Sequence, residues 1–249
     1  MCLSRGDPGA EGGEEGISTS YSISDAPKLR GCTAFVHLAE AGRPGISTDA
    51  SLARDIVKLC RTAGIGRITY LSGLGASPSS TSAHFLSRYA AEQEIASSGL
   101  EYTIFRPSFI LGTADRLTRG LKKQLKEGGA VIPGSGEYPV QPIHIDDACR
   151  IIRDSAISDA YLNSTVDLVG PRIVTYTEFL SGLKDRRTRR VELEEALRRA
   201  VTDHHYYFGP DDLAILVGGF VGDFEGLRAR HKGKFTPYEE ALKSSGLSQ

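Results

Sequence analysis

The stretch that decides the fold runs from residue 67 to residue 112, with the sequence RITYLSGLGASPSSTSAHFLSRYAAEQEIASSGLEYTIFRPSFILG. A β-branched and aromatic run at 68–71 is followed by a Ser/Pro/Gly loop, a helix-forming segment and a second such run at 102–105. This order predicts two parallel strands joined by a crossover helix. Ligands of open parallel sheets bind beyond the carboxyl ends of the strands, which here are 72–73 and 106–109.

Five stretches, in a consistent order and with consistent gaps, carry a resemblance to known proteins. They are GCTAFVHLA at 31–39, AGIGRITYLSGLGA at 63–76, GLEYTIFRPSFILG at 99–112, YPVQPIHIDDAC at 138–149 and VGPRIVTYTEFL at 169–180. They resemble the extended and atypical families of short-chain dehydrogenases/reductases. The nearest branch looks like the one that holds the NmrA-like regulators and the nucleotide-binding accessory subunit of respiratory complex I. The resemblance implies an α/β fold with a doubly wound, mostly parallel Rossmann-type sheet, truncated at its amino end, and a small helical lobe at the carboxyl end.

The same resemblance divides the chain. Residues 1–16 are Gly-rich and acidic with almost no apolar content, and we expect them to be disordered. Residues 17–170 are expected to form the Rossmann-like NAD(P)-binding domain, with insertions of a smaller lobe from about residue 128. Residues 171–249 are expected to form the helical lobe. Weak β alternation at 17–23 resembles the family's third strand, so the chain is expected to begin about two strands late.

A glycine-rich turn that grips a pyrophosphate is expected after an apolar first strand, and the sequence shows none. Gly9, Gly12 and Gly16 imitate the spacing, but no strand precedes them and the neighbouring glutamates would repel a pyrophosphate. In the family's sheet the first strand lies beside the strand at 34–38, which would therefore keep an open edge. The segment 17–23, a partner chain or upstream sequence could cover that edge. For the chain as given we expect poor solubility or self-association.

The resemblance assigns cofactor contacts to residues at two strand ends. Leu38 and Ala39 correspond to positions that border the adenosine and ribose of NAD or NADP, although an ordinary strand and turn would account for them equally. Pro107, Ser108 and Phe109 correspond to the turn that shields the nicotinamide. That turn is also explained as a rigid strand exit, because the residue before a proline is held extended. The residue that chooses between NAD and NADP ends the second strand, which this sequence does not show.

Catalysis in the classical members uses a Tyr and a Lys four residues later on one helix face, with a Ser at the end of the preceding strand. The family's spacing puts the Ser position at Ser72, the Tyr position at His84 and the Lys position at Arg88. His84 could exchange a proton near neutral pH and Arg88 could bind ribose hydroxyls, as an altered acid/base pair. The plainer interpretation is a strand-end hydrogen bond for Ser72 and no catalytic role for the other two. Tyr89 is a rival, but the residue four positions later is Gln93.

Other chemistries find little support in the sequence. The net charge of -1 argues against nucleic-acid binding by charge alone, and no apolar run is long enough for a membrane span. The 4 cysteines lack any CxxC spacing, which indicates neither a zinc site nor a disulfide framework and favours a reducing, cytoplasmic location. His144 and Asp146 would offer a metal only two ligands, so no metal site is predicted, and Asp146 is expected to cap the following helix. Capping boxes are predicted at 175–178 and 236–239.

Three functions fit these patterns. The first is an NAD(P)-binding protein with weak or no turnover, acting as an accessory or sensor subunit, which the departures at His84 and Arg88 favour. The second is an active NAD(P)-dependent reductase or epimerase on a small carbonyl or nucleotide-sugar substrate, which Ser72 and the strand-exit turns favour. The third is a structural or interaction module that binds no nucleotide, which the missing glycine turn favours. Self-association or a partner subunit at the open sheet edge is compatible with each.

Overall fold

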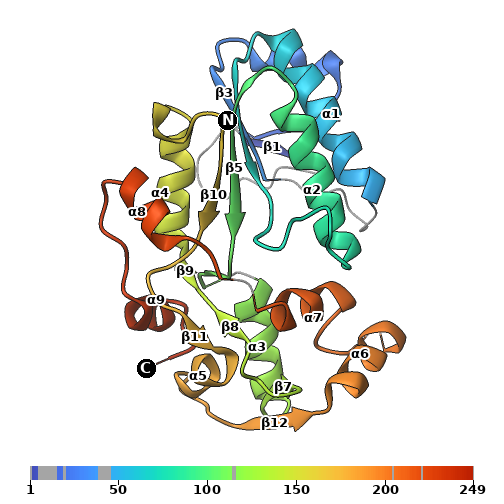
Figure 1. Ribbon diagram of the computed structural model, residues 1–249, viewed down its shortest axis with the longest axis vertical. Coiled ribbons are helices and arrows are strands. Elements are labelled where there is room, and N and C mark those ends of the chain that lie inside the picture. Colours follow the sequence, from blue (N-terminus) through green and yellow to red (C-terminus); the bar gives the residue numbers. More distant parts are fainter. Residues whose placement is uncertain are drawn as a thin grey trace.

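The computed structural model describes residues 2–4, 16–18, 21–38, 46–113, 116–203, 205–219 and 221–248. In Figure 1 a sheet with helices on both sides lies above a smaller lobe. Within the described ranges, no helix combines the length and the apolar character that a membrane crossing requires.

A four-stranded parallel sheet forms the centre of the larger lobe. Its strands are β3 (Ala34–His37), β4 (Arg67–Leu71), β5 (Glu101–Pro107) and β10 (Ser164–Leu168), in the order β10-β5-β4-β3. Ile68 lies opposite Phe35 on one side and Tyr102 on the other. The parallel pairing predicted for the runs at 68–71 and 102–105 is therefore confirmed.

Helices cover both faces of this sheet (Figure 1). They are the 3-10 turn η1 (Ile23–Leu29), α1 (Ile46–Ala63), α2 (Ala83–Ala96), α4 (Ile145–Ser155), the 3-10 turn η2 (Asp159–Tyr161) and α8 (Phe224–Arg230). α1, α2 and η1 share a core with Tyr70 and Ile104, whereas α4, η2 and α8 share one with Phe105 and Leu168. Neighbouring residues of β5 thus face two different cores, as in a strand buried on both faces. The doubly wound α/β fold expected from the sequence is confirmed.

The smaller lobe draws on two separate parts of the chain. Its elements are β6 (Ile110–Leu111), α3 (Arg116–Lys126), β7 (Ala130–Pro133), β8 (Pro139–Val140), β9 (Ile143–His144), β11 (Val174–Thr175), α5 (Tyr176–Ser181), β12 (Thr188–Val191), α6 (Leu193–Thr202), α7 (Pro210–Val217) and α9 (Tyr238–Ser244). β12 pairs with β7, β11 with β8 and β6 with β9, so the lobe contains short strands as well as helices.

One core of this lobe joins segments from both sides of the boundary proposed at residues 170 and 171. Leu121 and Val131 share one core with Phe179 and Leu213, so segments on both sides of that boundary bury their apolar faces together. α8 crosses back to the larger lobe, where Leu227 is buried beside β10. Apolar burial rather than order along the sequence decides which segments form each lobe.

The amino-terminal expectations are corrected in part. β1 (Cys2–Ser4) and β2 (Gly16–Ser18) pair as parallel strands and form a two-stranded sheet of their own. The disorder expected for residues 1–16 stays a prediction, because most of that segment lies outside the described residues. The segment 17–23 is not a continuous strand of the central sheet, because it leaves β2 after Ser18 and enters η1 at Ile23. Within the described residues, β3 is hydrogen-bonded only to β4.

Two predicted helix starts are wrong and one is confirmed. The capping box of Thr175 and Glu178 is present at α5. At α4 the cap is His144 rather than Asp146, because the His144 Nδ1 accepts a hydrogen bond from the Asp146 amide at 3.3 Å. At α9 the cap position is Pro237, so Thr236 lies one residue too early for a capping box, and its amide donates instead to Asp147 on α4 at 2.7 Å.

Candidate functional site

A cavity of about 650 Å³ opens where the parallel strands end above the smaller lobe. The loops that follow β4 and β5 form its upper wall, and α3 and α7 form its lower wall. Of the residues singled out from the sequence, those that line the cavity are Leu38, Ser72, His84, Arg88, Pro107, Ser108 and Phe109. Ala39 lies outside the described residues. Parallel strands bring these positions together because their carboxyl ends share one edge of the sheet.

Ser72 follows β4 and is held by a buried carboxylate. Its Oγ donates a hydrogen bond to Glu92 Oε1 at 2.6 Å, and the Glu92 side chain is 2% exposed. Glu92 also accepts two hydrogen bonds from the Arg106 guanidinium, at 2.9 and 2.6 Å, which raise the pKa of Arg106. A carboxylate can only accept, so the Ser72 hydrogen points to Glu92. Ser72 therefore presents lone pairs, not its proton, to anything else in the cavity.

Arg88 is buried on α2 with its side chain only 5% exposed. Its Nη1 donates to the Tyr70 hydroxyl at 3.2 Å and to the Leu71 carbonyl at 3.4 Å, and its Nε lies 4.0 Å from Asp49 Oδ2. Burial raises the pKa of Tyr70 to about 12, although the charge and hydrogen bond of Arg88 act in the opposite direction. Nη1 of Arg88 is therefore hydrogen-bonded between β4 and α2, and its guanidinium lies near the Asp49 carboxylate of α1.

His84 lies one helical turn before Arg88, so the two side chains share a face of α2. Its ring meets Phe85 edge-on, with 5.3 Å between ring centroids. His84 is half-buried and lines the cavity near the start of α2. The structure thus brings Ser72, His84 and Arg88 to one cavity, where Ser72 and Arg88 are hydrogen-bonded to other protein groups.

The strand-exit turn after β5 is tied to the segments around it. The Ser108 amide donates to the Leu168 carbonyl at 3.2 Å, and the Leu74 amide donates to the Pro107 carbonyl at 3.2 Å. The Phe109 carbonyl accepts from the Ile143 amide at 2.9 Å. The turn is therefore a fixed wall of the cavity as well as a rigid strand exit.

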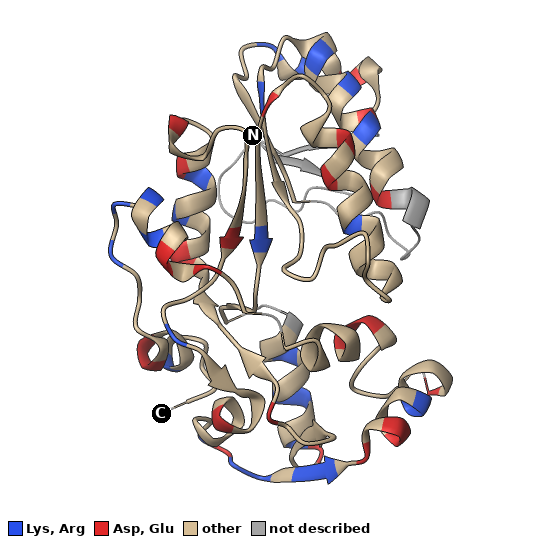
Figure 2. Cartoon of the chain, viewed as in Figure 1, with Lys and Arg blue, Asp and Glu red and all other residues tan. Residues whose placement is uncertain are grey.

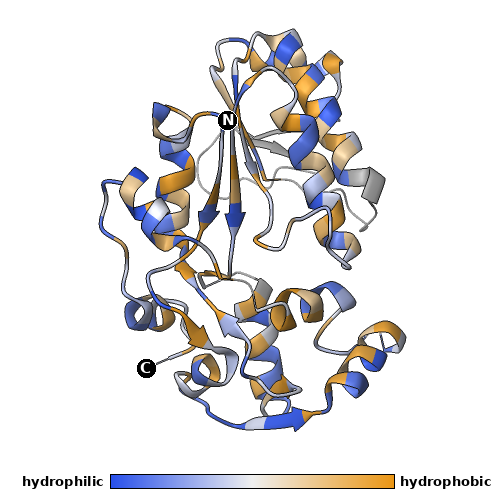
Figure 3. Ribbon diagram, viewed as in Figure 1, coloured by the Kyte–Doolittle hydropathy of each residue, from blue (hydrophilic) through white to orange (hydrophobic). Residues whose placement is uncertain are grey.

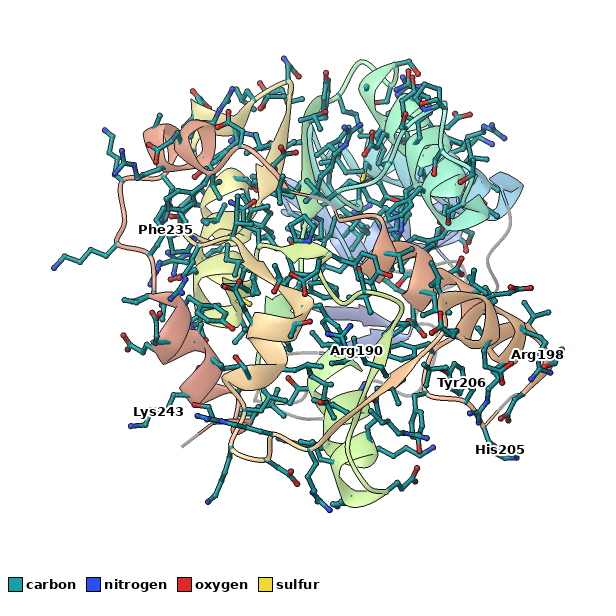
Figure 4. The ribbon with its side chains drawn as sticks, turned by 60° about the horizontal axis from the view of Figure 1, so that its bottom comes forward. Arg190, Arg198, His205, Tyr206, Phe235 and Lys243 are labelled. Atoms are coloured by element: carbon teal, nitrogen blue, oxygen red, sulfur yellow. The ribbon has the colours of Figure 1, made fainter. Side chains whose placement is uncertain are left out.

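The lower wall brings in residues that sequence reasoning did not select. Tyr207, Phe208, Asp211 and Asp212 line the cavity from the start of α7 and the loop before it. The adjoining Tyr206 is buried beneath Arg199, 4.5 Å from the guanidinium to the ring centroid, whereas His205 lies exposed at the periphery of the lobe (Figure 4). Gly209-Pro210 followed by two aspartates marks a helix start in the sequence, but nothing local says that this helix faces the sheet.

Glu92 was the other residue missed. It lies four positions after Arg88 on the buried face of α2. Two opposite charges at that spacing share one side of a helix, and this pattern could have indicated that Glu92 faces the same region as Arg88. Its partner Arg106 is the residue before Pro107, on the neighbouring strand. Sequence alone did not indicate that the two meet.

The comparisons with known proteins point to nucleotide binding. Residues 21–133 match a family model described as NAD(P)H-binding. Subunit 9 of the 1 alpha subcomplex of mitochondrial NADH dehydrogenase [ubiquinone] from Arabidopsis thaliana is 32% identical over 124 residues. That match covers 49% of this chain and 31% of the plant protein, so the chain matches less than a third of the length of this relative.

Solved structures share the fold at low sequence identity. A nucleoside-diphosphate-sugar epimerase from Staphylococcus aureus has a TM-score of 0.76 and 13% identity, covering 97% of this chain and 89% of its own. An NADPH-dependent quinone oxidoreductase from Escherichia coli, complexed with NADPH, has a TM-score of 0.72 and 17% identity, covering 93% and 83%. A triphenylmethane reductase from Citrobacter sp., complexed with NADP(H), has a TM-score of 0.70 and 19% identity, covering 94% and 84%.

The fold and the site define an NAD(P)-binding α/β protein with a Rossmann-type sheet. The resemblance to atypical and extended short-chain dehydrogenases/reductases, including the complex I subunit, is confirmed by these matches. NAD or NADP is therefore the cofactor class, as expected from the sequence.

The residues of the cavity fit one end of such a cofactor better than the other. The fixed turn at Pro107 and the hydroxyls of Ser72 and Ser108 suit the flat, polar-edged nicotinamide and its ribose. The glycines of the cavity lie in the loop after β4 and inside α3, where Gly120 is, and none lies in a turn leading directly from a strand into a helix. Within the described residues, a backbone cradle for the pyrophosphate is therefore not seen.

Proposed function

We propose that this chain is an NAD(P)-binding protein of the atypical short-chain dehydrogenase/reductase type with weak or no turnover, acting as an accessory or sensor subunit. The observation that carries this proposal is the state of the polar groups at the upper wall. Ser72 donates its hydroxyl hydrogen bond to Glu92, and Nη1 of Arg88 donates to the Tyr70 hydroxyl and the Leu71 carbonyl. A site for rapid proton transfer needs such groups turned toward the substrate.

The composition of the cavity supports the same proposal. Among the described lining residues there is no lysine, and the tyrosine among them is Tyr207, which belongs to the lower wall. The pair of a tyrosine and a lysine four residues later is thus replaced by His84 and Arg88. Arginine keeps its charge at all ordinary pH values and cannot be tuned as lysine can. The Arabidopsis relative is by name a subunit of a larger assembly, which favours an accessory role.

An active reductase or epimerase is the second candidate, and His84 is the observation that favours it. The imidazole lines the cavity on the same side as Ser72 and can exchange a proton near neutral pH. NAD(P) would supply or accept the hydride when bound. Small carbonyl compounds and nucleotide sugars are the substrate classes that this candidate implies, and structural neighbours named as epimerase and reductase are consistent with it.

A structural or interaction module that binds no nucleotide is the third candidate. The position of β3 favours it, because within the described residues β3 pairs with β4 alone and its Val36 is 37% exposed. A partner subunit or a second copy of the chain would pair with such an edge. A cytoplasmic location remains part of the proposal, supported by Cys32, Cys60 and Cys149, which are all free thiols.

Cofactor titration of the purified chain separates the third candidate from the other two. We expect NADH or NADPH to bind with saturable quenching of its fluorescence, and absence of binding to either would refute the proposed function. Hydride turnover on a panel of carbonyl substrates, measured with and without His84→Phe, separates the first two. Turnover that is readily measured and lost in His84→Phe would establish the active enzyme instead.

A further inference from the structure

We propose that the half of the cavity next to the smaller lobe takes a flat apolar molecule that is neutral or cationic, and disfavours an anionic nucleotide sugar. This inference rests on the proposed function, because it assigns the ligand that would lie beside the bound dinucleotide. It concerns the lower wall, which is formed by α3, α7 and the loop before α7.

The charges on the cavity wall are unequally divided. The charged side chains that line it are Arg88, Asp211 and Asp212. Arg88 belongs to the upper wall and is buried against Tyr70 and Asp49. Both carboxylates belong to the lower wall, in the first turn of α7, which is red in Figure 2 beneath the start of α2. The described part of the lower wall therefore carries negative charge without a cation.

Three basic residues contact aromatic rings at this wall without lining the cavity. Lys123 and Arg189 lie 5.9 and 5.3 Å from the centre of the Tyr207 ring, and Arg199 lies 4.5 Å from that of Tyr206. None of these three cations lines the cavity. In Figure 2 the blue strand β12 lies at the far end of the lobe from the sheet. A diphosphate in the cavity would therefore find no basic side chain among the described lining residues of the lower wall.

The start of α7 is also unavailable to an anion. Its N-terminal amides would normally favour a phosphate. The Gly209 amide already donates to Asp212 Oδ2 at 2.8 Å, so this helix end holds an anion of its own. A sugar diphosphate placed here would meet two carboxylates at close range, which costs affinity in a partly desolvated cavity.

The rest of the lower wall is apolar and aromatic. Its apolar members include Phe109, Leu117, Pro139, Phe208 and Ile215. Figure 3 shows α7 as mostly hydrophobic after its polar first turn. Flat rings gain burial against such a surface, and the face of an aromatic side chain attracts a cation.

Asp211 is the residue whose carboxylate would make the binding of a ligand depend on the ligand's charge. Within the described part of the chain its side chain takes part in no hydrogen bond or ion pair, whereas the Asp212 side chain accepts from the Gly209 amide. It is half-buried and faces the cavity. A cationic ring beside Asp211 would gain an attraction that a neutral ring of the same shape would not.

The test is to compare dissociation constants for matched probes, measured by calorimetry on the chain saturated with NADH or NADPH. The probes are 1-methylquinolinium as the flat cation, 2-methylquinoline at pH 8 as its neutral analogue, and UDP-glucose as the anion. We expect the cation to bind at least as tightly as the neutral ring, and UDP-glucose at least about tenfold more weakly than either. Tighter binding of UDP-glucose, or no binding of either quinoline, would overturn the inference.

Variants separate charge from shape. Asp211→Asn is expected to weaken the cation about fivefold and leave the neutral ring unchanged, whereas Asp211→Glu keeps the preference. Asp146→Asn is the matched control, because Asp146 also lies in the first turn of a helix, is 79% exposed and does not line the cavity. Equal binding of the cation to wild type and Asp211→Asn would contradict the role of Asp211. Failure to bind NADH and NADPH would instead refute the proposed function, which the first titration reveals separately.

Discussion

The carboxylate of Glu92 accepts hydrogen bonds from Ser72 and Arg106, and it is among the most buried charged groups described in the chain. We expect Glu92→Ala to lower the free energy of unfolding by about 3 kcal/mol, because Arg106 would keep its charge without a partner. Urea denaturation measures the change. The exposed pair of Glu195 and Arg198 is the control, and Glu195→Ala should cost about 0.5 kcal/mol. Similar losses in both variants would contradict the structural role of Glu92.

The buried tyrosines give the fold a dependence on alkaline pH. Burial raises the pKa of Tyr70 and of Tyr238 to about 12, and it raises the pKa of Tyr176 as well. In the unfolded chain a tyrosine loses its proton near pH 10, so the folded chain holds these protons more tightly. The stability from this source is complete below about pH 10 and is lost as the pH rises toward 12, at about 1.4 kcal/mol per pH unit for each tyrosine.

Tyr70→Phe tests that assignment. The variant loses the hydroxyl that accepts from Arg88, which should cost about 1 kcal/mol at pH 8. Between pH 10 and pH 11.5 its unfolding free energy should fall less steeply than that of the wild type, because one buried phenol no longer titrates. Urea midpoints at pH 8, 10 and 11.5 measure both effects. An unchanged slope would show that Tyr70 is not a source of the alkaline loss.

At the scale of elements, β3 is the strand whose surroundings matter most. It pairs with β4 alone among the described residues and exposes Val36, and Leu38 follows it. Unpaired strand edges with exposed apolar side chains promote association. We expect sedimentation velocity to show self-association that increases with concentration, and we expect Val36→Lys to reduce it.

The control for this prediction is Ile157→Lys. Ile157 is 78% exposed but lies in a turn after α4 and not in β3. A lysine there adds the same charge without touching β3, so association should persist. A wild-type chain that sediments as a single species over the whole concentration range would contradict the prediction.

The helix α2 shows how one element serves both stability and site. Its buried face carries Phe85 and Ile95 for packing and Arg88 and Glu92 for polar contacts. Charges at a spacing of four residues lie on one side of a helix, and here that side meets the ends of β4 and β5. The sequence pattern located the helix, but its mixture of apolar and charged residues left the function of the buried face open.

For the whole molecule, the sequence predicted the features that depend on residues close together in the chain, and it did not predict the contacts between distant segments. Alternating and β-branched runs at 68–71 and 102–105 report on neighbouring residues, and their parallel pairing was predictable because a crossover helix lies between them. The contacts inside the smaller lobe were not predictable, because Leu121 and Leu213 meet only after the chain has crossed between the lobes. The two wrong helix caps arose where the sequence did not show which group binds a backbone amide. The Thr236 amide donates to Asp147, and the Asp146 amide donates to His144.

The sequence by itself determined the parallel α/β core and the edge of its sheet at which a ligand would bind. These features depend on periodicity, turn residues and spacing, which are local properties of the chain. Only the tertiary structure decided that Ser72 donates to Glu92 and that Arg88 donates to the Tyr70 hydroxyl. It also decided that the acidic start of α7 lines the cavity from below. Those contacts join segments far apart in the chain, and the burial of apolar surface, which has no fixed direction along the sequence, sets which segments meet.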